Sequence, residues 1–284
     1  MRLGALVAVL TIGACAQEAP APAVIENTGK PMRLGFQCTE DDLRIFGLAC
    51  PASHPCPVYL ELAAVEPVGN RIFVAGNLHT ESVTLSSVLL VGSEGGKTWQ
   101  EPHERIRGAG LDQIQFLDFE AGWVAGGYLH TVPRDPFLLV TTDGGNNWRL
   151  RLVTSEGRVG TIESYAFDSR THGLLLLDRR MAGEAGSRYE LYESQTGGES
   201  WMIREVSDRP ILAAQKLARA PEAGWRVRAD ATSYRIEKRV GERWETVAAF
   251  LTRVGECRAP ELAVPPEPAV PPMPPAPPEP RKPA

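Results

Sequence analysis

Short runs in which apolar and polar residues alternate fill most of the chain, and glycine-rich corners separate them. A representative unit has the apolar run 136–140, the corner 141–147, Trp148 and a second alternating run, 149–153. Alternation with a period of two predicts half-buried strands, and a glycine-rich corner between two such runs predicts a β-hairpin. Because sustained helical periodicity is absent from residues 58–250, the central part of the chain is predicted to be all-β.

The corner before Trp148 recurs along the chain. Its counterparts precede Trp99 and Trp201, and a degenerate fourth copy precedes Trp244. A repeat of roughly 40 to 50 residues is typical of four-stranded propeller blades. The pattern therefore predicts a small β-propeller of about four blades. Two alternatives stay open: a partial fifth blade from residues 33–57, or an open array that closes by pairing with another chain.

The corners also carry a recognisable motif. They resemble the Asp-box, or BNR repeat, Ser/Thr-x-Asp-x-Gly-x-Thr-Trp. The matching or equivalent positions are Glu94, Gly96 and Trp99 in the first copy, Asp143, Gly145 and Trp148 in the second, and Gly198 and Trp201 in the third. Asp-boxes occur in sialidases, in other secreted glycoside hydrolases and in the non-enzymatic photosystem II assembly and stability factor family. In these proteins the box is a structural corner away from the active site, so the resemblance implies a fold, and a function by analogy only.

The two ends of the chain differ in composition from the repeats. Residues 1–16 combine an early arginine, a short apolar core and small residues, which predicts a secretory signal. Two ways of processing this signal stay open. Signal peptidase would cleave before Gln17, or a lipobox would make Cys15 a lipidated amino terminus. Residues 17–32 are predicted to be a linker, and residues 258–284 a disordered Pro-rich tail. The protein is therefore expected to be exported, periplasmic or extracellular, with membrane contact only through a lipid anchor at Cys15.

Four cysteines remain after the signal is removed or acylated: Cys38, Cys50, Cys56 and Cys257. An even number in an exported protein favours disulfides, and the absence of a Cys-x-x-Cys pair argues against a metal site. Three pairings exist, and sequence cannot choose between them. The preferred pairing joins Cys38 to Cys50 and Cys56 to Cys257, because the second bond would tie the start of the folded region to its end.

The folded region is divided into a cap and a propeller. Residues 33–57 do not follow the repeat, and a short helix is predicted at residues 40–48 with Thr39 as its cap. We interpret residues 33–57 as an amino-terminal cap on a propeller that spans residues 58–257.

Charge and motif content exclude some classes of function. The formal net charge is −5, and no basic patch interleaves with aromatic residues, so nucleic acid is not an expected partner. No cofactor or metal is expected. A sialidase-like hydrolase would need an arginine triad, a Tyr/Glu pair and an Asp acid/base, and the Arg-Ile-Pro motif of that family is absent. No catalytic residue is therefore assigned, and a degenerate sialidase-like glycoside hydrolase is kept as the alternative function.

The preferred function is an exported, non-catalytic module that binds or assembles an envelope protein or glycan partner. Its candidate site is the charged, glycine-containing segment 101–112 with the neighbouring hairpin loop, because blade crossings deliver side chains to the mouth of a propeller channel. The candidate binding residues are His103, Glu104, Arg105, Arg107, Asp112, His130 and Arg134. The competing interpretation is that Arg105, Arg107 and Asp112 are paired charges that staple adjacent blades.

Overall fold

The protein is almost entirely β-structure. A computed structural model describes residues 23–130, 132–154, 157–179, 187–211 and 224–259. The predicted signal with Cys15 and nearly all of the Pro-rich tail lie outside these residues. Within the described ranges no helix has the length and hydrophobicity needed to cross a membrane.

The described strands form four antiparallel sheets. The first has the order β1-β5-β4-β3-β2-β17 and contains β1 (Ile25–Glu26), β2 (Cys56–Val68), β3 (Arg71–His79), β4 (Thr84–Ser93), β5 (Thr98–Gln100) and β17 (Arg253–Cys257). The second contains β6 (Ala109–Phe116), β7 (Gly122–Tyr128), β8 (Arg134–Thr141) and β9 (Arg149–Leu152). The third contains β10 (Thr161–Phe167), β11 (Gly173–Asp178), β12 (Tyr189–Ser194) and β13 (Met202–Ser207). The fourth contains β14 (Trp225–Ala229), β15 (Ser233–Val240) and β16 (Arg243–Leu251).

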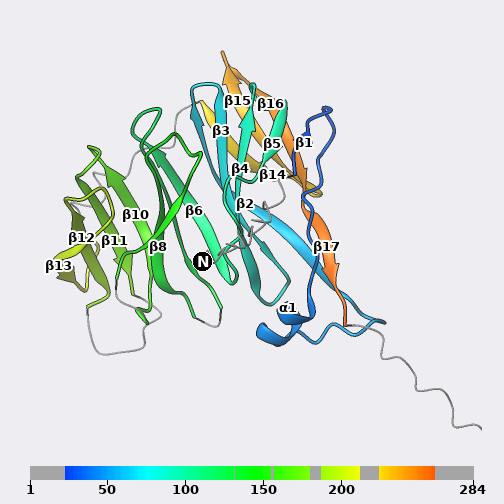
Figure 1. Cartoon of the computed structure of the whole chain (residues 1–284), viewed down its shortest axis with the longest axis horizontal. Coiled ribbons are helices and arrows are strands. Elements are labelled where there is room, and N and C mark those ends of the chain that lie inside the picture. Colours follow the sequence, from blue (N-terminus) through cyan, green and yellow to red (C-terminus); the bar gives the residue numbers. More distant parts are fainter. Residues whose placement is uncertain (1–22, 131, 155–156, 180–186, 212–223, 260–284) are drawn as a thin grey trace, which may run out of the picture.

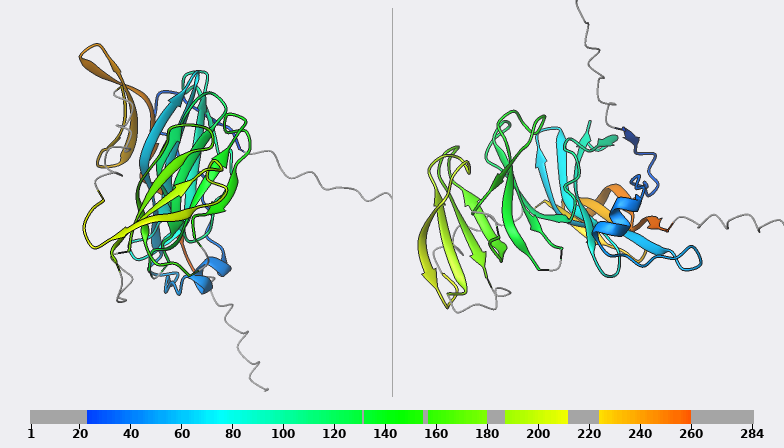
Figure 2. Two further views of the ribbon diagram at one scale, coloured as in Figure 1. Left: turned by 90° about the vertical axis from the view of Figure 1, so that its left-hand side faces the viewer. Right: turned by 60° about the horizontal axis from the view of Figure 1, so that its bottom comes forward.

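The sheets follow one another in the spatial order fourth, first, second, third (Figure 1). One apolar cluster joins the first sheet to the fourth and to the cap, a second joins the first and second sheets, and a third joins the second and third sheets. Each sheet thus buries its faces against its neighbours, which is the radial arrangement of a β-propeller. The four sheets also agree with the predicted all-β class. Figure 2 shows the fourth sheet, in orange and brown, standing apart from the third.

The glycine corners are built as the repeats predict. In the second copy Gly144 and Gly145 have φ of 72° and 82°, values that only glycine adopts without strain. The indole of Trp148 folds back over the turn, and its Nε1 donates a hydrogen bond to the carbonyl oxygen of Gly145 at 3.1 Å. Trp99 makes the same bond to Gly96 at 3.0 Å and is fully buried.

Among the described residues, the two remaining corners lack the bond from the indole to the glycine carbonyl. Trp201 packs against the cluster between the second and third sheets, but its indole nitrogen has no hydrogen-bond partner among the described residues. The fourth copy is not a box, which corrects the sequence interpretation. It is the tight β15–β16 hairpin, in which Val240 pairs with Arg243. Trp244 lies instead beneath the guanidinium of Arg226, 4.1 Å from the ring centre.

The disulfides correct the preferred pairing. Cys38 is bonded to Cys257 across 219 residues, and Cys50 to Cys56 across 6. The loop after Cys50 reverses at a turn in which His54 N–H donates to the Pro51 carbonyl, and this brings Cys50 to Cys56. A bond between the start and end of the folded region does exist, but Cys38 supplies it rather than Cys56.

The cap carries the one described helix, α1 (Glu40–Ile45), which is shorter than predicted. Thr39 caps it, and Asp42 at its third position completes a capping box with the Thr39 backbone. The Cys38–Cys257 bond fixes this cap to β17, the last strand of the first sheet.

Candidate functional site

One strand from each of the four sheets lines a cavity of about 440 Å³, which we call the axial cavity, and we call these four strands the inner strands. Its lining comes from β2, β6, β10 and β14, elements far apart in the sequence. The lining residues are Ala63, Ala64, Val65, Glu66, Asp112, Gln113, Ile114, Gln115, Ser164, Tyr165, Trp225, Arg226 and Val227. A concave, partly apolar space with a few polar groups at the centre of a propeller is the usual form of a binding site in such folds.

Three of the four inner strands are bent at an equivalent point by a β-bulge. The register along β2, β6 and β10 shifts by one residue, which leaves Ala63, Asp112 and Glu163 as the extra residues. A bulge bends its strand and redirects the side chain at that point. Of the three bulge residues, Ala63 and Asp112 line a second, smaller hollow of about 120 Å³. Asp112 therefore stands where the two spaces meet.

The axial cavity is acidic at this junction. Asp112 is open to the cavity but enclosed by protein on most sides, and this burial raises the pKa of its carboxyl group to about 7. Glu66, on the neighbouring inner strand, is buried. Burial, together with the negative charges of Asp112 and Glu66, raises the pKa of Tyr165 well above its usual value. Asp112 is thus the group of this cavity that can change its charge near neutral pH.

Other polar groups in the cavity are held by fixed partners. The hydroxyl of Tyr165 donates to the backbone carbonyl of Trp123 at 2.7 Å, across the interface between the second and third sheets. Arg226 donates to the buried carboxylate of Glu237 at 2.7 Å. The side-chain amide of Gln115 both donates to and accepts from the backbone of Phe167. These bonds fix the shape of the cavity before any ligand arrives.

Four of the seven candidate binding residues lie around the amino-terminal segment rather than in the cavity. Arg105 is paired with Glu101 at 2.7 Å and donates to the carbonyl of Gly35 at 2.8 Å. Arg107 reaches Asp42 of α1 at 3.3 Å. His103 and Glu104 line, with Arg105, a surface hollow of about 510 Å³ that also includes residues of the amino-terminal segment.

The remaining three candidates are separated from one another. His130 packs edge-on against Phe46 of the cap, with ring centres 5.4 Å apart. Arg134 lies 3.9 Å from its neighbour Asp135. Asp112 is the one member of the set that lines the axial cavity. The structure therefore distributes the seven residues over the cap region, the start of β8 and the cavity, and it does not gather them into one site.

Sequence reasoning missed Glu66, Trp225 and Arg226 as cavity residues. The available signal was positional, because Asp112 and Glu163 follow Trp99 and Trp148 at similar intervals, where the next inner strand begins. That spacing could have marked the inner strands of the second and third sheets. The same interval after Trp201 falls within residues 212–223, outside the described residues, so it does not lead to β14.

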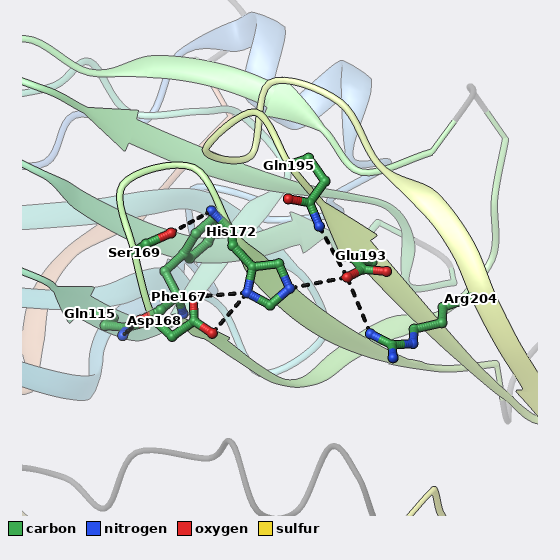
Figure 3. Close-up of polar contacts among 8 residues, drawn as sticks. All are labelled: Gln115, Phe167, Asp168, Ser169, His172, Glu193, Gln195 and Arg204. Carbon is green, nitrogen blue, oxygen red and sulfur yellow. Dashed lines mark hydrogen bonds and ion pairs between the residues drawn. The ribbon is translucent and has the colours of Figure 1, made fainter.

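A second polar cluster lies at the rim of the third sheet (Figure 3). The Nδ1 of His172 contacts both oxygens of Asp168 at 2.8 Å, and its Nε2 contacts Glu193 at 3.1 Å. Arg204 of β13 donates to the same oxygen of Glu193 at 3.2 Å. Hydrogen bonds from the ring to the two carboxylates, led by the bond to Asp168, raise the pKa of His172 despite its partial burial. Because both ring nitrogens are occupied, this cluster acts as a clamp between strands rather than as a base.

Comparisons with known proteins give only distant likeness. No protein-family model matches the chain, and no curated protein matches its sequence. Among solved structures, "YCF48 bound to D1 peptide" is 16% identical with a TM-score of 0.36, covering 68% of this chain and 56% of that one. YCF48 from Cyanidioschyzon merolae is 18% identical with a TM-score of 0.33, covering 68% and 57%. A GH74 xyloglucanase from Xanthomonas campestris is 15% identical with a TM-score of 0.36, covering 65% and 28%.

The chain thus spans little more than half the length of the two YCF48 chains and just over a quarter of the xyloglucanase. At this level of likeness none of these proteins assigns a function to it.

Proposed function

We propose that the protein is an exported, non-catalytic module that binds an envelope protein or glycan partner in the axial cavity. The observation that carries the proposal is the convergence of four inner strands, from four different sheets, on one space of about 440 Å³. A cavity of this size suits a peptide side chain or a sugar unit, and its walls are fixed by bonds between sheets.

The arrangement of the polar groups favours binding over catalysis. Tyr165 and Arg226 are committed to Trp123 and Glu237, so neither side chain is free to attack or to stabilise a substrate. Among the described residues, Arg226 is also the one arginine or lysine that lines the axial cavity. A sialidase-like site would need several arginines that converge on the substrate carboxylate, and the described part of the lining provides one.

The test is to fill the cavity. Ser164 lines it from β10, and Ser164→Trp would occupy the space where a ligand would bind. Wild-type protein immobilised on a support should capture a partner from envelope extract, and Ser164→Trp should lose that capture. The same change at the exposed Ser53 of the cap is the matched control and should retain it. Equal capture by the two variants would remove the axial cavity as the binding site.

Trp225 allows a second measurement of partner binding, because it lines the cavity. Adding the purified partner should change the tryptophan fluorescence of the wild-type protein. The change should be lost in Trp225→Phe while capture is retained, since phenylalanine keeps an apolar ring at this position.

A degenerate glycoside hydrolase is the second candidate, and Asp112 is the observation that favours it. A carboxyl group with a pKa of about 7 is poised to act as a general acid or base near neutral pH, and Glu66 lines the same cavity. Purified protein should then release the aryl group from an aryl glycoside or sialoside at neutral pH, and Asp112→Asn should abolish that release. Turnover of this kind would replace the binding proposal.

Export rests on separate observations. Disulfides persist in oxidising compartments, and both bonds of this protein tie down the cap and the adjacent strands. Release of the mature protein to the periplasm or medium, and the fate of Cys15, can be determined by mass spectrometry of the processed amino terminus.

A further inference from the structure

The last strand of the third sheet, β13, carries exposed apolar side chains along a free edge. Within the described residues it pairs with β12 alone. Met202, Ile203 and Val206 are 66%, 52% and 54% exposed. In Figure 1 this strand lies at the extreme left of the molecule, at the opposite end from the cap. An unpaired edge with apolar side chains is a template for adding another strand.

The corresponding edge of the second sheet is protected from pairing with another strand in a different way. The edge strand β9 presents Arg149 and Arg151, and both are paired with Glu199 of the third sheet. An arginine-rich edge repels a second copy of itself, whereas β13 carries adjacent opposite charges, Arg204 and Glu205, flanked by apolar residues. The two edges therefore differ in what they can pair with.

The order of residues along β13 is self-complementary. Read from each end, its six residues are Met-Ile-Arg and Ser-Val-Glu. An antiparallel pairing centred between Arg204 and Glu205 would set Arg204 against Glu205 of a second copy. It would also set Ile203 against Val206. Opposite charges and apolar pairs directly across a sheet are both stabilising.

A bulge in β13 makes this pairing sterically consistent. Residues that lie opposite each other in an antiparallel pair must face the same side of the sheet. The register against β12 skips Arg204, because Glu205 lies opposite Leu191 and Ile203 opposite Tyr192. The bond from Arg204 to Glu193 places the arginine on the same face as Leu191 and Glu205. The bulge thus gives Arg204 and Glu205 the shared face that a two-fold pairing requires.

We propose that β13 pairs with β13 of a second copy of this chain, antiparallel about a two-fold axis, so that the two third sheets join. Such a contact is isologous, since each copy contributes the same surface. One added strand pair is a small interface, so the dimer is weak and its population depends on concentration. The contact lies outside the axial cavity and is independent of what that cavity binds.

The experiment is sedimentation equilibrium of the full mature chain over a wide concentration range, with a charge-swap series. The wild-type protein should dimerise. Arg204→Glu and Glu205→Arg should each raise the dimer Kd about tenfold, because each places like charges opposite each other twice per dimer. The double variant R204E/E205R should return the Kd close to the wild-type value. Arg239→Glu, the same charge change on the exposed face of β15, should leave it unchanged.

The double variant distinguishes pairing between two copies from an effect of the substitutions on the fold of a single copy. It restores the contact between copies but not the bond from Arg204 to Glu193, so recovery cannot come from a repaired monomer. Two outcomes would overturn the proposal: a wild-type protein that stays monomeric at every concentration, or a double variant as weak as the single ones.

Discussion

Single side chains determine how firmly each corner of the propeller is held, and Asp143 is the clearest case. Its carboxylate accepts hydrogen bonds from the Thr141 hydroxyl, the backbone N–H groups of Asn146 and Asn147, and the Asn147 side-chain amide. Burial would raise the pKa of Asp143, but these bonds outweigh it and lower the pKa to about 2. The corner of the first sheet has Glu94 at the same position, and no equivalent set of bonds converges on that side chain.

The first prediction follows from these bonds. Asp143→Ala should lower the free energy of unfolding by about 1 kcal/mol at neutral pH, the value of a charge-assisted hydrogen-bond set at an exposed turn. The pKa is lower in the folded protein than the ordinary value of about 3.9, so the stabilisation is present above that value and is lost as the pH falls towards 2. Urea unfolding of both proteins at several pH values measures this. A difference that persists at pH 2 would contradict the assignment.

His172 gives the second prediction, with the opposite sign. Its pKa is raised in the folded protein, chiefly by hydrogen bonding to Asp168, so the protonated clamp stabilises the third sheet below the unfolded pKa of about 6.5. That contribution should disappear as the pH rises through the folded pKa. The difference in unfolding free energy between wild type and His172→Gln should therefore shrink from acidic to alkaline pH. Asp168→Asn should flatten the same pH dependence, and a constant difference would rule out the clamp.

Arg105 and Arg107 illustrate what residue patterns leave undecided. A charged, glycine-containing crossing between blades suggested a binding surface, and also the alternative of paired charges. In the structure Arg105 is paired with Glu101 and Arg107 with Asp42. No sequence pattern could reveal the partner of Arg107, because Asp42 belongs to a cap that is distant in sequence and follows no repeat.

At the scale of elements, the glycine corners lock neighbouring sheets together. A Cβ at Gly145 would lie 2.6 Å from the ring of Phe73, a residue of the first sheet, and 3.1 Å from the indole of Trp148. Two features therefore require a glycine at position 145: its φ of 82° and the close approach of the neighbouring sheet. The Trp148 ring also stands edge-on to Phe73 at 6.0 Å. The corner is thus part of the interface between the first and second sheets.

The third prediction compares two glycines with nearly the same backbone. Gly145→Ala should destabilise the protein by about 3 kcal/mol, combining the strained φ with overpacking against Phe73. Gly157 has a φ of 81° and open space where a Cβ would stand, so Gly157→Ala should cost about 1 kcal/mol. Thermal or urea unfolding of the two variants measures the difference. Equal losses would mean that the packing against Phe73 contributes nothing.

The strands were predictable because alternation and glycine corners are local signals. The inner strands are the exception, since their bulges at Ala63, Asp112 and Glu163 depend on how each strand bends around the axis. Gly76 and Gly126 stand beside the first two bulges, where a Cβ would collide with backbone atoms. A glycine near the end of the second strand of a sheet therefore indicates a bulge in the strand it pairs with. The third sheet has Leu177 at this position, so the same signal is missing there.

At the scale of the whole molecule, the longer disulfide contributes most to holding the cap and the last strand on the first sheet. The fourth prediction compares the two bonds. In the chain-entropy account, closing the loop from Cys38 to Cys257 contributes about 5 kcal/mol and closing the loop from Cys50 to Cys56 about 2 kcal/mol. Replacing both cysteines of the long bond by serine should therefore destabilise the protein far more than replacing both of the short bond. Guanidinium unfolding of the two double variants tests the order, and a reversed order would contradict it.

The architecture was predictable from the repeats, whereas the position of the axial cavity and the disulfide pairing were not. A regular series of tryptophan corners specifies radial sheets, because each corner joins the same two strands of its sheet. The pairing of Cys38 with Cys257 depends on where the last strand, β17, returns beside β2, and no periodic signal marks that return. The axial cavity depends in the same way on β14, because no tryptophan corner marks that strand as one that lines the axis.

The first sheet contains both β1 and β17, so the two ends of the described chain finish in one sheet. Any mechanical tension between a tethered amino terminus and whatever the Pro-rich tail attaches to would pass through this sheet and its long disulfide. The second and third sheets do not lie between the two ends, so they would not carry this tension. A protein pulled from both ends would thus keep its far sheets, and the free strand at their margin, in their resting shape.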